Sequence, residues 1–243
     1  MTLLLLLLSV FPGERIATLP TGRLLEDGTW QFGISHRFLS AADNSVLEGN
    51  LLNFLRNANV LVTFDRGIGG RVGAGAWFSN EPNKEVGLRA AYAPTHWTTL
   101  YAGVGANVVE FAADNAFANL ALAVPLTFAE RIHLLAMPRV TTNLAGTDNL
   151  FVSLGLGAQG SLGQGFSLGL EAEPVLLGPD PGPEAPPRLL AWNLALDKQV
   201  GWHNFTLVAG NSWAQTAPYW FSAANRDILK GRFRVGFNIL RKF

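Results

Sequence analysis

The sequence contains no cysteine, which excludes disulfide bonds, thiolate metal sites, a cysteine nucleophile and a lipoprotein anchor. Charged residues are also scarce, at 15% of the chain against about a quarter in an ordinary soluble protein. The formal net charge is zero, so nothing indicates a nucleic-acid partner. No apolar run reaches the roughly 18 residues that a membrane-spanning helix needs, and such a helix is therefore not expected.

The chain is instead rich in apolar residues (49%), aromatic residues (11%) and glycine, which occurs 26 times. This composition suits β-strands that face lipid on one side and a small-residue interior on the other. With 243 residues the chain is long enough for one large β domain.

The first residues, MTLLLLLLSVF, resemble the apolar core of a secretory signal, although the usual basic flank is missing. We predict a signal-like segment over residues 1–13, a periplasmic lead-in over 14–28 and a barrel domain over 29–243. The alternative for the first segment is a buried apolar stretch.

Apolar and polar residues alternate with a period of two in twelve segments, which is the pattern of half-buried strands. In the first segment Trp30, Phe32 and Ile34 share one face, while Gln31 and Arg37 share the other. The twelve predicted strands cover residues 29–38, 58–65, 71–79, 85–92, 100–107, 117–126, 132–140, 150–159, 166–173, 190–196, 205–209 and 232–239.

The connections between these segments alternate between long and short, as they do in outer-membrane barrels. An even number of strands places both ends of the barrel on the short-turn, periplasmic side. In hydrocarbon an open sheet edge would leave unpaired backbone groups, each costing several kcal/mol, so the last strand must pair with the first. The predicted fold is thus all-β, a single closed antiparallel up-and-down transmembrane barrel located in the bacterial outer membrane.

Aromatic residues gather near both ends of the predicted strands, where they would form the two interfacial girdles of a lipid-spanning barrel. The alternative is that aromatic residues simply favour strands. The predicted girdles contain Trp30, Tyr92, Trp97 and Trp202 at the periplasmic end and Phe38, Trp213, Tyr219 and Trp220 at the outer end.

The last thirteen residues, GRFRVGFNILRKF, form an apolar alternation that ends on a terminal aromatic residue. They resemble the C-terminal signal by which the barrel assembly machinery recognises outer-membrane proteins, with Arg241 at a usually apolar position. The residues that carry this resemblance are Phe233, Val235, Phe237, Ile239 and Phe243.

Several longer stretches carry a family resemblance: TWQFGISHRF, ANVLVTFDRGIGGRVGAGAW and HNFTLVAGNSWAQTAPYW, followed by the C-terminal stretch. Together they resemble an uncharacterised family of bacterial outer-membrane barrels typical of the Bacteroidetes. The resemblance runs from Arg15 to Phe243 and is specific at the two ends. It implies a barrel without known activity and supplies no catalytic residues.

Charged residues of the predicted strands fall on the inward face, since a charge on the lipid face would cost roughly 2–4 kcal/mol at the midplane. We expect Asp65 to pair with Arg71 across the first periplasmic hairpin, and Arg37, Arg232 and Arg234 to meet at the closure seam. The predicted lumen charges are Arg37, Asp65, Arg71, Glu85, Arg89, Arg139, Glu171, Glu173, Arg232 and Arg234.

Two interpretations of these charges stay open. They either form a salt-bridge network that fills a closed lumen, or line a narrow, weakly anion-preferring pore in which inward glycines leave room for water. We therefore predict a non-enzymatic barrel, acting as a small-solute channel or as a structural barrel, with membrane lipids and the assembly machinery as partners.

Two alternatives belong to other classes of protein. A lipid-active enzyme would use His36, but Ser35 points to the opposite face of the strand and cannot pair with it. A soluble lipocalin-like carrier would have eight strands rather than twelve. The spacing of the four histidines indicates no metal site, and no cofactor is expected.

Overall fold

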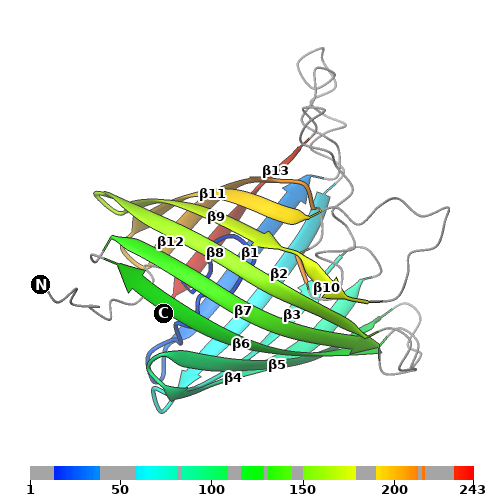
Figure 1. Cartoon of the computed structure of the whole chain (residues 1–243). Coiled ribbons are helices and arrows are strands. Elements are labelled where there is room, and N and C mark those ends of the chain that lie inside the picture. Colours follow the sequence, from blue (N-terminus) through cyan, green and yellow to red (C-terminus); the bar gives the residue numbers. More distant parts are fainter. Residues whose placement is uncertain are drawn as a thin grey trace, which may run out of the picture.

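The computed structural model shows one closed sheet (Figure 1). It describes residues 14–38, 58–80, 84–108, 116–128, 131–143, 150–178, 190–212, 215–216 and 233–243. Within these ranges no helix is long and apolar enough to span a bilayer.

The described residues form thirteen strands. They are β1 (Trp30–Phe38), β2 (Ala58–Ile68), β3 (Val72–Ser79), β4 (Glu85–Thr95), β5 (Thr98–Asn107), β6 (Ala116–Phe128), β7 (Ile132–Asn143), β8 (Phe151–Gly163), β9 (Phe166–Glu173), β10 (Val175–Leu177), β11 (Ala191–Val200), β12 (His203–Gly210) and β13 (Arg234–Lys242).

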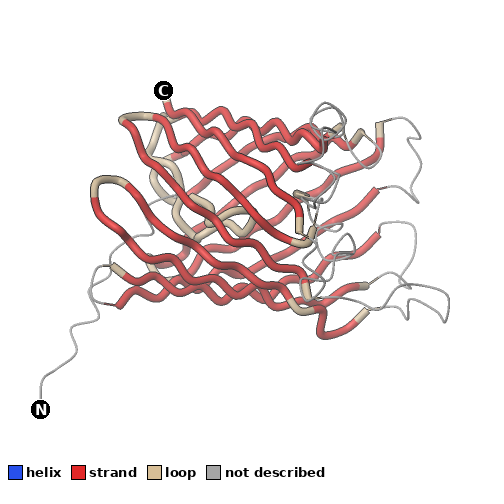
Figure 2. Tube along the Cα trace, turned by 90° about the horizontal axis from the view of Figure 1, so that it is seen from above, coloured by secondary structure: helices blue, strands red, loops and turns tan. Residues whose placement is uncertain are grey.

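Every neighbouring pair in the ring is antiparallel, and β13 pairs with β1 from Gln31↔Lys242 to Arg37↔Gly236. The backbone polar groups of the two end strands thus satisfy each other, as the closure argument requires. Figure 2 shows the tilted strands along the length of the barrel. The prediction of a closed antiparallel barrel is confirmed.

The thirteenth strand does not add a position to the ring. After β9, Pro174 interrupts the ladder because it has no N–H to donate, and β10 continues along β8 with a shifted register. β9 and β10 therefore share one place, and the ring is twelve strands around, as predicted.

From β2 to β9, each short hairpin turn joins an even-numbered strand to the next strand along the chain. In the β2–β3 turn Gly69 and Gly70 have φ values of +59° and +70°, a backbone conformation that residues with a Cβ rarely adopt. Phe243 lies at the same end of the barrel as these turns, because its backbone exchanges hydrogen bonds with Trp30.

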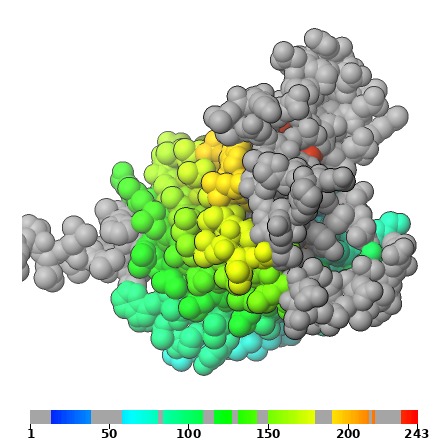
Figure 3. All heavy atoms as spheres, turned by 45° about the vertical axis from the view of Figure 1, so that its right-hand side comes forward, coloured from blue at the N-terminus to red at the C-terminus, as the bar shows by residue number. Residues whose placement is uncertain are grey.

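The two faces of the strands differ as the alternation predicts. On β1, Gln31 and Arg37 are only 3% and 2% exposed, whereas Phe32 on the outer face is 37% exposed. Rows of outward Leu, Val and Phe cover the exterior, and Figure 3 shows the convex outer surface that strands from the middle of the chain build side by side.

The hydrophobic core lies inside the ring and is not formed by strands alone. Ile16, Ala17 and Leu19 are buried there against small and apolar wall residues. The predicted periplasmic lead-in over residues 14–28 is therefore wrong for its larger part, because residues 15–25 lie within the barrel. Figure 2 shows this segment as a loop inside the ring of strands. The predicted signal segment, 1–13, lies outside the described residues.

Candidate functional site

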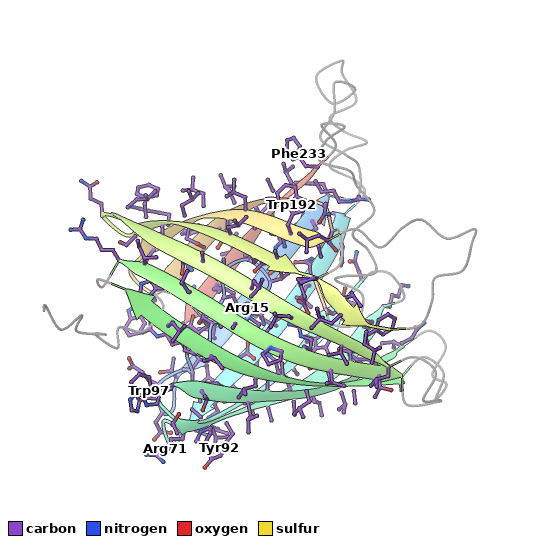
Figure 4. The ribbon with its side chains drawn as sticks, viewed as in Figure 1. Arg15, Arg71, Tyr92, Trp97, Trp192 and Phe233 are labelled. Carbon is purple, nitrogen blue, oxygen red and sulfur yellow. The ribbon has the colours of Figure 1, made fainter. Side chains whose placement is uncertain are left out.

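Residues 14–25, called the plug from here on, form a compact loop that enters the lumen and returns. The backbone N–H of Ile16 donates to the carbonyl of Leu19 (3.1 Å), and that of Thr21 donates to the carbonyl of Glu14 (2.9 Å). Arg15 and Pro20 face each other across this turn. The turn places Arg15 inside the outline of the barrel, behind β7 and β8 in Figure 4.

The tip of the plug is held by one carboxylate of the wall, that of Glu171 on β9. The backbone N–H groups of Ala17, Thr18 and Leu19 donate to it at 3.1, 3.0 and 2.9 Å. The Thr18 hydroxyl and the Asn193 side chain, the latter at 2.7 Å, donate to the same carboxylate. Hydrogen bonds to a charged group contribute about 1.5–3 kcal/mol each, so Glu171 is the strongest single attachment of the plug.

Glycines of β8 and β9 receive the apolar side chains of the plug. A Cβ at Gly169 would lie 2.6 Å from Ile16, a Cβ at Gly157 would overlap the same side chain, and one at Gly155 would lie 3.2 Å from Leu19. In the pore interpretation the inward glycines leave room for water. At these three positions they leave room for the plug instead.

The plug also contacts the opposite wall. Thr99 on β5 donates its hydroxyl to the carbonyl of Gly22 (2.6 Å), and Asn238 on β13 donates to the carbonyl of Ala17 (2.9 Å). Glu14 forms an ion pair of 2.5 Å with Lys242 at the C-terminal end of β13. The plug is thus bound to strands on several sides of the lumen.

Asp65 pairs with Arg89 rather than with Arg71. Arg89 Nε donates to Asp65 Oδ1 at 2.6 Å, and Nη2 binds the second carboxylate oxygen. Arg71 lies exposed in the β2–β3 turn and at the end of the barrel in Figure 4, so its placement in the lumen was wrong. The inward row of Asp65, Gly75 and Arg89 explains the choice of partner, because Gly75 has no side chain to block Arg89.

A second ion pair spans three strands in the same way. Arg139 Nη1 on β7 lies 3.1 Å from both carboxylate oxygens of Glu173 on β9, and Ser153 of the intervening β8 donates to Glu173 at 2.5 Å. Glu85 accepts a hydrogen bond of 2.6 Å from Thr216. These groups are buried in the lumen, as the parity of the strands indicates.

The closure seam is lined by Arg37, which donates to the Asn238 side chain at 2.8 Å. Arg234 is buried two residues before Gly236, the cross-strand neighbour of Arg37. Arg232 lies outside the described residues, so its expected contact with the other two stays a prediction. Asp197 is an additional interior carboxylate, not among the predicted lumen charges, although its alternation with Leu194 and Leu196 indicates the inward face.

The residues predicted for the periplasmic girdle lie at the end of the barrel that carries the short turns, and their role as a girdle stays a prediction. Trp30 packs against Phe64 with ring centroids 4.9 Å apart, and the Arg66 guanidinium lies 4.8 Å from the Trp30 ring. Tyr92 and Trp97 project from the same end in Figure 4, and Trp202 is exposed. At the other end Phe38 is described, whereas Trp213, Tyr219 and Trp220 lie outside the described residues.

One aromatic residue near the start of β6 lies inside the lumen. Phe117 is only 3% exposed and packs inside the lumen against Trp77 and Leu61. Residues Phe233, Val235, Phe237, Ile239 and Phe243 lie on the less buried, outward side of β13 and its ends. Their recognition by the assembly machinery stays a prediction.

His36 sits in an aromatic environment on the outer face. Its ring stacks on Phe237 at 5.0 Å and meets Phe38 edge-on at 4.7 Å, and its Nδ1 has no hydrogen-bond partner among the described residues. Ser35 is buried on the inner side, so these neighbours form no nucleophile–base pair. In the described part of the chain no group of side chains suits a metal ion.

Beside the plug a cavity of about 170 Å³ remains in the lumen. Plug residues bound it on one side and residues of β1 to β7, with Gln215 and Thr216, on the other. Its lining includes five arginines and two acidic residues, namely Arg15, Arg23, Arg66, Arg89, Arg139, Glu14 and Asp65.

A closed ring of twelve antiparallel strands with an apolar exterior and a charged interior defines a membrane-spanning β-barrel of the porin type. Residues 127–243 match the model of an uncharacterised family described as a membrane bound beta barrel domain (DUF5777). This match confirms the resemblance to uncharacterised membrane barrels, while the link to the Bacteroidetes stays a prediction.

Solved structures support the fold. A structure described as KdgM porin superposes with a TM-score of 0.55 at 8% identity, covering 88% of this chain and 99% of the other. The KdgM porin in complex with disordered oligogalacturonate gives 0.54 at 8% identity with the same coverage. No curated protein matches the sequence.

Proposed function

We propose that the protein is a non-enzymatic channel for small solutes in the bacterial outer membrane, closed in this structure by its plug. The observation that carries the proposal is that a separate chain segment, rather than the wall's own side chains, fills much of the lumen. A purely structural barrel needs no such segment, because larger inward side chains in place of Gly155, Gly157 and Gly169 would fill the space.

The comparisons agree with this proposal at the level of the fold. A barrel with the same arrangement of strands is a porin, and one of its structures contains an oligogalacturonate. At 8% identity the likeness does not transfer a solute to this chain.

A weak preference for anions follows from the charges beside the plug. Five arginines and two acidic residues border the remaining cavity, which gives the bordering residues an excess of positive charge. Membrane lipids would contact the outward Leu, Val and Phe rows, and the C-terminal strand would be recognised by the assembly machinery during insertion.

A reversible lock of the plug tests the proposal. The chain has no cysteine, so the double substitution Thr18→Cys and Asn193→Cys introduces the only two thiols. The native side chains of these residues approach to 3.1 Å, which is close enough for a disulfide to connect the plug to β11.

Planar-bilayer recordings of this variant should show conductance steps under reducing conditions and their loss after oxidation. Under reducing conditions in asymmetric KCl the reversal potential should indicate weak anion preference. Wild-type protein carried through the same redox cycle is the control. Silence of the reduced variant, with the folded barrel verified by a heat-modifiability gel, would favour a structural barrel.

A further inference from the structure

The guanidinium of Arg15 is held inside the barrel without a protein partner of its own. Among the described residues it forms no hydrogen bond and no ion pair, although it lines the cavity beside the plug. Arginine is almost never buried unless it is paired. Its position therefore requires an explanation from the surroundings.

The neighbouring charges do not neutralise it. Arg89 repels Arg15, and the only carboxylate of the wall that attracts it, Asp65, is already bound through both oxygens to Arg89. Glu14 also attracts Arg15 but is paired with Lys242. The guanidiniums of Arg15 and Arg89 and the carboxylate of Asp65 together carry one net positive charge at this end of the cavity.

Burial and, to a smaller extent, the positive charge of Arg89 together lower the pKa of the Arg15 guanidinium to about 10, against the opposing effect of Asp65. At neutral pH the group is still protonated, so the uncompensated charge is permanent. A bound anion would remove both the desolvation cost and the repulsion between the two arginines.

The cavity has the size and the donors for such an anion. A volume of about 170 Å³ accommodates a small organic or inorganic anion with a few waters. The amide of Asn119, which lies over Gly103, and the side chain of Tyr101 border the same space and add polar groups to the two guanidiniums. A guanidinium pair is suited to a carboxylate or phosphate group, which it can bind through two oxygens.

We propose that this cavity is a binding site for a small oxyanion, a carboxylate or a phosphate, held between Arg15 of the plug and Arg89 of β4. The inference deepens the proposed function. It rests on that function in one respect, namely that the bound anion is a solute of the channel. Because Arg15 belongs to the plug and Arg89 to the wall, the bound anion also links the two and stabilises the closed state.

Calorimetric titration of the refolded protein in detergent micelles tests the site directly. The probes are sodium acetate and inorganic phosphate, with sodium chloride at matched ionic strength as the reference. We expect saturable binding of at least one oxyanion and none of chloride. Acetate alone would assign a carboxylate and phosphate alone a phosphate, and either supports the site.

Three variants test which residues bind the anion. Arg15→Gln should weaken binding about tenfold or more, the loss expected for one charge-assisted contact. Arg71→Gln removes a guanidinium from an exposed turn and should leave binding unchanged. Asp65→Asn removes the competing carboxylate and should tighten binding, a change of opposite sign that damage to the fold cannot produce.

Absence of saturable binding of both oxyanions to the wild type would overturn the inference, as would equal affinities of wild type and Arg15→Gln. If Arg15→Gln does not refold, an Asp65→Asn variant without tighter binding has the same consequence. Binding in micelles is independent of conductance, so a barrel that binds the anion and never conducts would defeat the channel proposal alone.

Discussion

Arg89 on β4 binds both carboxylate oxygens of Asp65 on β2, although the whole of strand β3 lies between them. The pair is made possible by Gly75, which stands between the two residues in the same inward row. Its missing side chain lets the carboxylate lie directly on the β3 backbone.

Gly75→Ala should therefore destabilise the barrel. A methyl group at this position would overlap Asp65 Oδ1 and lie 2.9 Å from the Phe64 carbonyl oxygen, so the ion pair must shift. Overpacking of this kind costs about 1–3 kcal/mol. Urea unfolding in lipid vesicles, followed by tryptophan fluorescence, measures the loss.

The matched control is Gly160→Ala on β8, where an added Cβ meets nothing within 4 Å. Its unfolding midpoint should equal that of the wild type within error. Equal midpoints for both variants would show that the row tolerates a side chain and that Gly75 has no role in the pair.

Asp65 pairs with Arg89 and not with Arg71, and this difference shows how much of the barrel interior can be predicted from the sequence. Alternation tells which face of a strand a residue occupies, and it indicated the inward face for the predicted lumen charges that the structure describes, Arg71 excepted. It does not tell which residues of neighbouring strands share a row, because this depends on register. Arg71 was also predicted to be a strand residue. In the structure it belongs to the β2–β3 turn, and its side chain is exposed.

The plug could not be predicted for a different reason. Its contacts join residues far apart in the chain, such as Ala17 and Glu171, which are separated by 154 positions. A single loop has no periodic pattern of apolar residues from which its burial could be predicted. The one available signal was the set of glycines on the inner faces of β8 and β9, which the sequence leaves open to either water or a plug.

Ile16 packs against the glycines of β8 and β9. A larger residue at one of these glycines should therefore displace the plug, and a smaller residue at position 16 should compensate for it. Gly157→Ala introduces a methyl group that overlaps Ile16 and should displace the plug, again at a cost of about 1–3 kcal/mol. The plug then leaves the lumen more often, and open time in planar bilayers should increase.

Combining Gly157→Ala with Ile16→Ala should restore closure toward the wild-type level, because the smaller side chain makes room for the new methyl group. Gly160→Ala, on the same strand but in open space, serves as the control and should not change open time. A double variant that is more open than either single variant would contradict direct packing of these two residues.

The Glu171 carboxylate should decide how often the plug is out of the lumen. Glu171→Gln preserves the size of the side chain but replaces charge-assisted hydrogen bonds from three backbone N–H groups by neutral ones. A loss of about 1.4 kcal/mol already raises the released population tenfold. The readout is labelling of Ala17→Cys, the sole thiol in the chain, by a membrane-impermeant maleimide.

Ala17 is only 2% exposed, so its labelling rate reports departure of the plug, and Glu171→Gln should accelerate it about tenfold. Glu85→Gln, which neutralises a buried carboxylate bound to Thr216 and not to the plug, should label at the background rate. If both carboxylate variants accelerate labelling equally, the cause is a general loosening of the lumen. Only a selective effect of Glu171→Gln assigns the attachment to the contacts between this carboxylate and the backbone of residues 17–19.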